Sequence, residues 1–301
     1  KKSFSKSVSM NSDIFVSTEL SLAGYPPQDL LLRNDFISKI NSFKKKIINL
    51  TKKTSTIFVL NIPEIERKKL FNTVFLIKSG NVIFKISKSS LPNYGVFDEK
   101  RYFYSGKNDC NVFKFKNKNL KFFICEDLWS SDLTKKEKKK TDLIFFLNAS
   151  PFEINKFKKR ISISKKNAIH FDSSLIYLNL VGSQDDLVFD GGSFFMNQYG
   201  EILDCASFFE EDELLIDTKE KKNKKIILLD KNEHLYNALM TSLNDYCKKN
   251  NFSTALIGIS GGIDSALTAS IAADVLGSKN IKSFFLPSIY TSKESRNDAQ
   301  N

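Results

Sequence analysis

The 301-residue chain is 41% hydrophobic and 27% charged, which is too apolar for a disordered chain, and no apolar run reaches the ~18 residues of a membrane span. Its net charge of +12 comes almost entirely from lysine. Because arginine, the residue suited to bidentate base and phosphate contacts, is scarce, we expect a solvated basic surface with no nucleic-acid or membrane partner. Four widely spaced cysteines without a C-x-x-C pair favour a reducing, cytoplasmic setting, and no secretory signal is expected.

Short β-branched or aromatic runs bounded by turn residues predict a series of strands. They lie at 13–20, 54–60, 72–78, 81–87, 120–126, 141–150, 173–180, 192–197 and 213–218. Ser79-Gly80 between two of these strands predicts a hairpin. Patterns of helical period at 34–51 and 155–171 lie between the strands, so the mixture predicts an α/β architecture.

The composition changes at the lysine-rich stretch 218–232, which we interpret as a linker. It separates two predicted domains, 1–217 and 233–301. The length of the chain agrees with this division, because about 150 residues per domain predicts two domains.

The second predicted domain opens with an amphipathic helix at 233–250. Its apolar residues near one face are Leu235, Leu239, Leu243 and Tyr246. A buried strand, TALIGIS, then precedes glycines and an alanine-rich helix at 264–276 that Gly277 ends. These elements predict the start of an α/β domain with a parallel sheet.

Three reactive side chains lie where predicted strands end, namely Glu19, Lys88 and Cys125. A cysteine nucleophile must lose its thiol proton, and histidine is the usual partner. The two histidines, His170 and His234, fall in or at the start of helical patterns and not beside the cysteine. A carboxylate base with a lysine is therefore the better arrangement, although a cysteine that ends an apolar strand is more often a packed core residue.

The sequence around these residues contains five longer motifs: ELSLAGYPPQDLLLR, KSSLPNYGVFDEKRYF, CEDLW, NASPF and LNLVGSQDDLVFDGGSFF. Over residues 13–217 they resemble the glutaminase half of glutamine-dependent NAD synthetases, which belongs to the nitrilase-like carbon–nitrogen hydrolases. The resemblance implies a four-layer αββα sandwich that needs no cofactor. It implies Glu19 as general base, Lys88 as charge stabiliser and Cys125 as the nucleophile that attacks the side-chain amide of glutamine. A thioester and ammonia would form, and water would then hydrolyse the thioester.

The same resemblance implies further residues at the glutamine pocket, with turn or packing roles as the alternative. They are Tyr94, Glu99, Glu126, Trp129 and Ser150. Tyr94 and Glu99 match positions that shape the pocket and support the lysine.

A second motif, LIGISGGIDSALTASIAADVLG, runs from a strand through glycines into a helix. Glycines and a helix N-terminus suit phosphate, but the spacing is neither Walker A nor the dinucleotide fingerprint. The motif resembles the SGGxDS pyrophosphate loop of the N-type ATP pyrophosphatases, and its context resembles their NAD synthetase branch. The resemblance implies that ATP phosphates bind Ser260, Gly261, Gly262, Asp264 and Ser265. Ser288 and Ser292 are weaker candidates, with helix capping as the alternative.

Taken together, the two halves resemble a fragment of a glutamine-hydrolysing NAD synthase. Its expected substrates are glutamine, ATP and deamido-NAD, with homo-oligomers of the full-length protein. The resemblance also implies magnesium, whose ligands we expect mostly beyond Asn301, and no metal ligands are predicted in this chain. Because a ligase domain needs roughly 200 residues to bury a core, we expect this piece alone to lack ligase activity.

Three alternatives remain open at this stage. A free-standing nitrilase-type amidase would leave the SGGIDS motif unexplained. A different ATP pyrophosphatase, such as one that thiolates tRNA, would not need Glu19, Lys88 and Cys125. A basic nucleic-acid-binding protein would show an affinity that falls steeply with salt.

Overall fold

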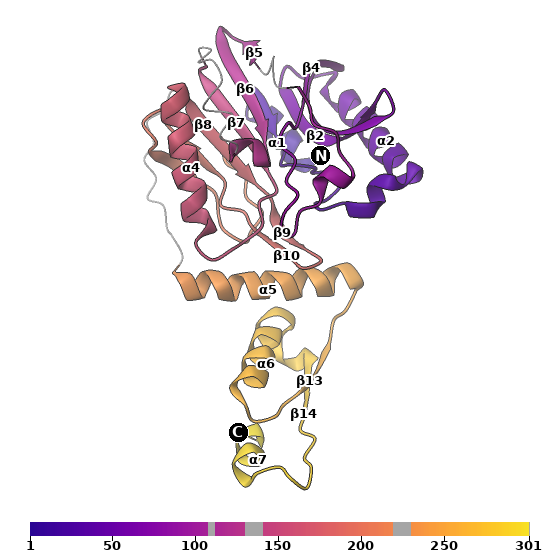
Figure 1. Cartoon of the computed structure of the whole chain (residues 1–301), viewed down its shortest axis with the longest axis vertical. Helices are drawn as coiled ribbons and strands as arrows, with labels where there is room; N and C mark the ends of the chain where they lie inside the picture. The colour runs from indigo at the N-terminus through magenta and orange to yellow at the C-terminus, as the bar shows by residue number, and fades with distance from the viewer. Residues whose placement is uncertain (108–111, 130–140, 219–229, 301) are drawn as a thin grey trace.

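The computed structural model describes residues 1–107, 112–129, 141–218 and 230–300, which form two bodies joined at one long helix (Figure 1). In the larger body, two β-sheets pack face to face between outer helices. The smaller unit contains the C-terminal residues and extends away from the larger body. The predicted linker 218–232 falls mostly outside the described residues.

The first sheet has the strand order β1-β2-β3-β4. Its strands are β1 (Ile14–Val16), β2 (Ile57–Glu66), β3 (Lys69–Lys78) and β4 (Asn81–Ser87). β1 runs parallel to β2, and the other neighbours are antiparallel. The predicted hairpin is confirmed, because Ser79 and Gly80 both have positive φ and join Lys78 to its ladder partner Asn81.

The second sheet has the strand order β12-β11-β8-β7-β6-β5. Its strands are β5 (Val112–Phe115), β6 (Lys118–Ile124), β7 (Leu143–Asn148), β8 (Ser174–Asn179), β11 (Phe194–Met196) and β12 (Ile202–Cys205). β6, β7 and β8 are parallel, so their carboxyl ends lie at one edge of the sheet. A separate antiparallel hairpin follows β8 and consists of β9 (Val181–Gln184) and β10 (Leu187–Asp190).

The layered arrangement follows from strands that are apolar on both faces. Along β2, Ile57 and Val59 pack against the second sheet, whereas Phe58 and Leu60 pack against helices. The helices on the first sheet are α1 (Lys2–Ser9) and α2 (Asn34–Thr51), and α4 (Lys156–Phe171) covers the second sheet (Figure 1). The expected αββα sandwich is therefore confirmed.

Several sequence-based predictions for this body need correction. The first strand ends at Val16 and does not reach residue 20, because the Leu20 amide donates to the side chain of Asn61 on β2 (2.6 Å) and not to the backbone of that strand. Residues 213–218, which the structure describes, form no strand. Ile216 packs against the core between the sheets, but the backbone there joins no ladder. Helix α1 and strands β5, β9, β10 and β12 were not predicted.

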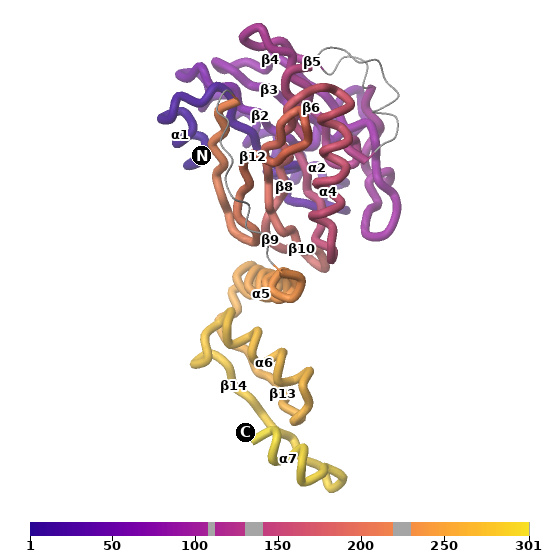
Figure 2. Tube along the Cα trace, turned by 90° about the vertical axis from the view of Figure 1, so that its left-hand side faces the viewer, coloured from indigo at the N-terminus to yellow at the C-terminus, as the bar shows by residue number. Residues whose placement is uncertain are grey.

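Helix α5 (Lys231–Asn250) lies between the larger body and the C-terminal unit, as the two perpendicular views show (Figures 1 and 2). It contacts the β9–β10 hairpin on one side and α6 (Ile263–Leu276) on the other. The helix begins inside the predicted linker, because the Asp230 carboxylate caps it by accepting hydrogen bonds from the amides of Asn232 and Glu233.

The apolar face predicted for α5 is not its buried face. Leu239 and Tyr246 are exposed, whereas Ala238 and Cys247 are buried. The prediction was wrong because α5 packs against two separate neighbours, while the periodicity argument assumes a helix that covers a single sheet.

The C-terminal unit has the element order strand, helix, strand, helix, with α6 as its first helix. Its other elements are β13 (Ala255–Gly258), β14 (Ile281–Phe284) and α7 (Lys293–Gln300). The predicted parallel pairing is confirmed between β13 and β14. β13 is not buried as predicted, since Leu256 is 70% exposed. Among the helices of the described ranges, none is long and apolar enough to cross a membrane.

Candidate active site

The candidate catalytic side chains come from strand ends in both sheets. Cys125 directly follows β6 and Lys88 directly follows β4, whereas Glu19 lies in the turn beyond β1. Because β6 and β7 are parallel, the segments after them emerge at the same edge, and Cys125 lines a pocket there together with Ser150.

A buried cluster of charges lies at the centre of the site. Lys88 Nζ donates to Glu19 Oε1 at 2.8 Å and to Glu99 Oε1 at 2.7 Å. Lys88 and Glu19 have no exposed surface, and Glu99 is 5% exposed. Tyr25 donates its hydroxyl hydrogen to Glu99 Oε1 at 2.8 Å. One ammonium group thus faces two carboxylates inside the sandwich, where each charge needs a partner.

Both carboxylate oxygens of Glu19 are held by the protein. Asn72 Nδ2 donates to Oε1 at 2.9 Å, and the amide of Ala149 donates to Oε2 at 3.0 Å. Asn72 is fixed in turn by Asn61, whose Nδ2 donates to Asn72 Oδ1 at 2.8 Å. The carboxylate is therefore oriented before any substrate arrives.

The pKa values of Lys88 and Cys125 are both raised, but for different physical reasons. Burial opposes the charge on Lys88, but the carboxylates of Glu19 and Glu99 outweigh it and raise the pKa of Lys88 well above its ordinary value. Burial raises the pKa of the Cys125 thiol, the Glu19 carboxylate raises it further, and Lys88 opposes the rise. Lys88 is therefore a permanent cation, and Cys125 is a neutral thiol at rest.

The backbone at Cys125 is unusual for a residue with a side chain. Its φ is +40°, in the sharp turn between β6 and the short 3-10 helix Cys125–Leu128. Asp127 stabilises the turn, since its carboxylate accepts hydrogen bonds from the amides of Ile124 (3.1 Å) and Ser90 (2.8 Å). Asp127 thus ties the turn that carries Cys125 to the loop that follows Lys88.

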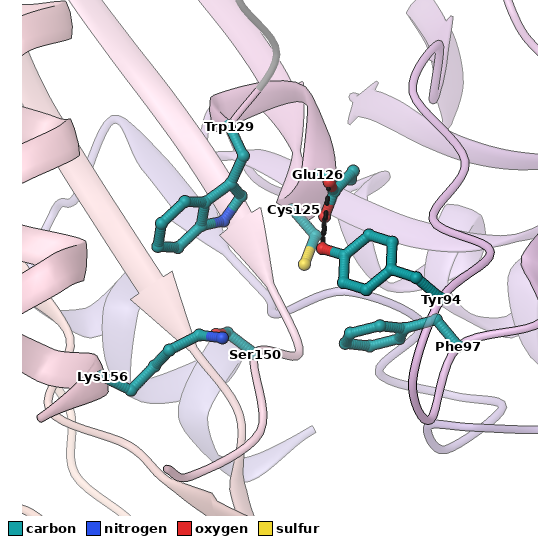
Figure 3. A pocket seen from close by; sticks show the side chains of 7 residues that line it. All are labelled: Tyr94, Phe97, Cys125, Glu126, Trp129, Ser150 and Lys156. Carbon is teal, nitrogen blue, oxygen red and sulfur yellow. Dashed lines mark hydrogen bonds between the residues drawn. The ribbon is translucent and has the colours of Figure 1, made fainter. Parts of the chain in front are cut away.

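Cys125 opens onto a pocket of about 380 Å³, open solvent included (Figure 3). The pocket is lined by Tyr94, Phe97, Cys125, Glu126, Trp129, Ser150 and Lys156. The Cys125 sulfur points between Tyr94 on one side and Trp129 and Ser150 on the other. The Tyr94 hydroxyl donates to the Glu126 carboxylate, with oxygen distances of 3.0 and 3.1 Å.

The structure brings most of the predicted pocket residues together. Tyr94, Glu126, Trp129 and Ser150 line the pocket with Cys125. Glu99 does not line it but lies behind it on Lys88.

Sequence reasoning missed several residues of the site: Tyr25, Asn61, Asn72, Phe97, Asp127 and Lys156. Asn72 carried a usable signal, because an asparagine inside an apolar strand needs a buried partner. Lys156 carried none, because it is one of many lysines in the chain.

The SGGIDS loop lies on the C-terminal unit, between β13 and α6. Gly262 is the N-cap of α6, and Ser265 Oγ accepts from the Ser260 amide (3.2 Å) and donates to the Gly262 carbonyl (2.9 Å). Gly261 has a φ of +84°, and a Cβ there would lie 2.4 Å from the Ser295 carbonyl oxygen. Asp264 is in the first turn of α6. The loop is thus compact, and Ser260, Gly262 and Asp264 are exposed.

Ser292 lies before α7, where its Oγ accepts from the Ser295 amide (3.0 Å) as a cap does, and the Ser288 amide donates to Thr291 Oγ1 (2.8 Å). Within the described ranges, no group of three or more His, Cys, Asp or Glu side chains is arranged to hold a metal ion.

Fold and site together define an αββα sandwich of the nitrilase type, with a cysteine at the edge of the second sheet. A solved amidase of the nitrilase superfamily from Nesterenkonia shares this fold, with a TM-score of 0.61 and 19% identity over 68% of this chain and 78% of that one. The family model for carbon–nitrogen hydrolases matches residues 3–219, and the model for NAD synthase matches residues 235–301. The chain belongs to the carbon–nitrogen hydrolase family.

Curated relatives match both parts of the chain. It is 34% identical to the glutamine-dependent NAD(+) synthetase of Thermotoga maritima, over 96% of this chain and 57% of the relative. It is 37% identical to that of Acinetobacter baylyi, over 96% of this chain and 54% of the relative. A solved glutamine-dependent NAD+ synthetase from Acinetobacter baumannii, in complex with ADP, has a TM-score of 0.91 at 34% identity, over 99% of this chain and 57% of that one. The chain spans about half the length of these relatives.

Proposed function

We propose that this chain hydrolyses the side-chain amide of glutamine at Cys125 and releases ammonia. The observation that carries the proposal is the fully buried Glu19–Lys88 pair (2.8 Å) behind the pocket that Cys125 lines. Such a pair provides a base and a fixed positive charge without a histidine.

The first half of the reaction follows from the charges at the site. Since the raised pKa keeps the Cys125 thiol neutral at rest, its proton passes to Glu19 as the sulfur attacks the amide carbon. The ammonium of Lys88 stabilises the negative charge that develops on sulfur and on the amide oxygen. The proton then moves from Glu19 to the leaving nitrogen and the C–N bond breaks. Ammonia leaves, and the acyl group remains on Cys125 as a thioester.

The second half restores the enzyme. Glu19, again a carboxylate, takes a proton from water as the water oxygen attacks the thioester carbon. The C–S bond breaks, glutamate leaves, and the thiol regains its proton. Because Asn72 and Ala149 hold the Glu19 carboxylate in one orientation, the same oxygens serve both halves.

Two pocket residues of opposite charge support an amino acid as the substrate. The Glu126 carboxylate suits an α-ammonium group, and the Lys156 ammonium, 5.5 Å from the Trp129 ring centroid, suits an α-carboxylate. Tyr94 supports the Glu126 carboxylate through its hydroxyl group. Lys156 pairs with Glu153 (2.7 Å) and Glu126 with Tyr94, but a simple aliphatic amide would make use of neither charge, which favours glutamine over the substrate of a free-standing amidase.

For the C-terminal unit we propose that the SGGIDS loop binds ATP phosphates, with Ser260, Gly261, Gly262, Asp264 and Ser265 around them. The solved Acinetobacter baumannii relative is a complex with adenosine diphosphate, which supports a nucleotide as a ligand. In the whole protein, with magnesium, the carboxylate of deamido-NAD would take the AMP group of ATP and release pyrophosphate, and ammonia would then displace AMP to form NAD. On this proposal, residues 1–217 are the glutaminase domain and residues 233–301 begin the synthetase domain.

The test is ammonia release from glutamine by this chain and by its Cys125→Ala and Cys205→Ala variants. We expect release by the parent chain and by Cys205→Ala, and none above background by Cys125→Ala. Release by Cys125→Ala at the parent rate would refute the nucleophile assignment. Equal rates with glutamine and acetamide would favour the free-standing amidase instead.

A further inference from the structure

A buried ion pair lies beneath the glutamine pocket, outside the cluster around Lys88. Arg160 on α4 donates from its NH1 nitrogen to Asp190 Oδ1 at 2.6 Å, and both side chains are at most 1% exposed. The other guanidinium nitrogens bind the segment after β7. Nε donates to Ser150 Oγ at 3.2 Å, and NH2 donates to the carbonyls of Ser150 (2.8 Å) and Pro151 (3.0 Å).

That segment serves two parts of the proposed active site at once. The amide of Ala149 holds Glu19, and Ser150 forms a wall of the pocket. Asn179 fastens the segment from the second side, since its Oδ1 accepts from the Ser150 amide at 2.9 Å and its Nδ2 donates to Asp190 Oδ1 at 3.3 Å. The position of the Asp190 carboxylate is therefore coupled to both the base and the pocket wall.

The second oxygen of Asp190 faces a residue of α5. His234 Nε2 lies 3.8 Å from Asp190 Oδ2, and within the described residues this buried nitrogen has no hydrogen-bond partner. The imidazole is enclosed by Phe152 (stacked, 5.7 Å), Phe208 (4.8 Å) and Phe209 (5.2 Å). The ring is thus fixed in place beside a buried carboxylate.

The same end of α5 is joined to the C-terminal unit. Tyr236, two residues after His234, donates its hydroxyl hydrogen to Asp274 Oδ2 on α6 at 2.5 Å. Helix α6 begins at the SGGIDS loop. A continuous series of contacts therefore runs from α6 through α5 to Asp190, Arg160 and the pocket.

We propose that His234 is a positioning residue through which α5 sets the geometry of the glutamine pocket. Its imidazole, 3.8 Å away, limits where the Asp190 carboxylate can lie, and Arg160 transmits the position of that carboxylate to Ala149 and Ser150. The proposal rests on the proposed function, because it assigns a role at the same site. It gives the C-terminal unit a physical route to the glutaminase reaction.

The test uses this chain with His234→Phe, which keeps an aromatic ring among the phenylalanines but removes the nitrogen. Asp245→Asn is the matched control, since Asp245 binds the Ser183 amide (2.7 Å) at the far end of α5. We expect His234→Phe to raise the KM for glutamine by about two- to thirtyfold, with a smaller change in kcat and unchanged thermal unfolding. Asp245→Asn should leave both kinetic constants unchanged.

Two further measurements decide the case. When His234→Phe is combined with Ser150→Ala, the fold-change in KM should be smaller than the product of the two single fold-changes, because both changes act through Ser150. Iodoacetamide should also alkylate Cys125 more slowly in His234→Phe, as followed by peptide mass spectrometry, and this measurement needs no glutamine. Parent values of KM and alkylation rate in His234→Phe would overturn the proposal. If the parent chain released no ammonia, the proposed function would fail, while the alkylation rate would still test the coupling.

Discussion

Lys88 Nζ and Glu19 Oε1 lie 2.8 Å apart, although 69 residues separate them in the chain and neither side chain is exposed. Lys88 follows the last strand of the first sheet, and Glu19 follows the first strand of the same sheet. The ion pair therefore joins the segments that follow the two outer strands of that sheet, β1 and β4. The predictions below depend on this arrangement.

Glu19→Gln should lower kcat/KM for glutamine by about 10²- to 10⁴-fold, the usual contribution of a general base. The amide of the new side chain cannot accept the thiol proton, and it would turn an N–H group toward one of the donors that now bind the carboxylate. Steady-state ammonia release gives the measurement.

Glu64→Gln is the control for this change. Glu64, on β2 of the first sheet, also pairs with a lysine, Lys44 of α2 at 3.3 Å, but away from the pocket. The Glu64→Gln variant should release ammonia from glutamine at the parent rate. A folded Glu19→Gln variant with parent turnover would rule out Glu19 as the base.

The stability of the fold should depend on pH through Glu99. Burial raises the pKa of Glu99 to about 7 from an ordinary value of 4.5, with Lys88 opposing the rise. Between these values the folded chain binds more protons than the unfolded chain, so the contribution of Glu99 to the free energy of unfolding falls as pH rises.

Glu99→Gln removes this titration. From pH 5 to pH 8 the variant should gain about 2 kcal/mol of unfolding free energy relative to the parent chain. Urea unfolding of both proteins at the two pH values measures the difference. A difference that stays constant across this range would contradict the raised pKa.

Lys156→Met should raise the KM for glutamine by about ten- to hundredfold with a smaller effect on kcat, because a charged hydrogen bond to the α-carboxylate is lost. Lys159→Met, on the exposed side of α4, is the matched control and should have no effect. The analogue 4-aminobutanamide, which lacks the α-carboxylate, separates the explanations. If Lys156→Met also weakened this analogue, Lys156 would not recognise the carboxylate.

Gly261→Ala should loosen the SGGIDS loop. The left-handed φ of +84° and the approach of the Ser295 carbonyl (2.4 Å from a Cβ) leave no room for a methyl group. Such strain costs about 1–3 kcal/mol, so hydrogen exchange should quicken at residues 260–265 and at the start of α7, and ATP should bind more weakly.

Gly262→Ala is its neighbouring control, because a Cβ there meets nothing closer than Ser260 Oγ at 3.4 Å. Its hydrogen exchange should match that of the parent chain. Unchanged exchange in Gly261→Ala would show that the loop accommodates the methyl group.

Helix α2 was predicted with its observed bounds, and the hairpin at Ser79 and Gly80 was also predicted correctly. Both depend on local patterns, a helical period and a two-residue turn with positive φ, which neighbours in the chain determine. The strand prediction at 213–218 was wrong because a strand needs a partner, and no local pattern shows where one lies.

In the active site, the amino-acid sequence alone showed which residue types lie at strand ends, Lys88 and Cys125 among them, and which family their motifs resemble. The partners around them became visible only in the folded chain: Asn72 and Ala149 on Glu19, Ser90 on Asp127, and Lys156 across the pocket from Tyr94. These contacts join segments that are far apart in the chain. Their formation depends on how the two sheets stack, and spacing along the chain does not encode that arrangement.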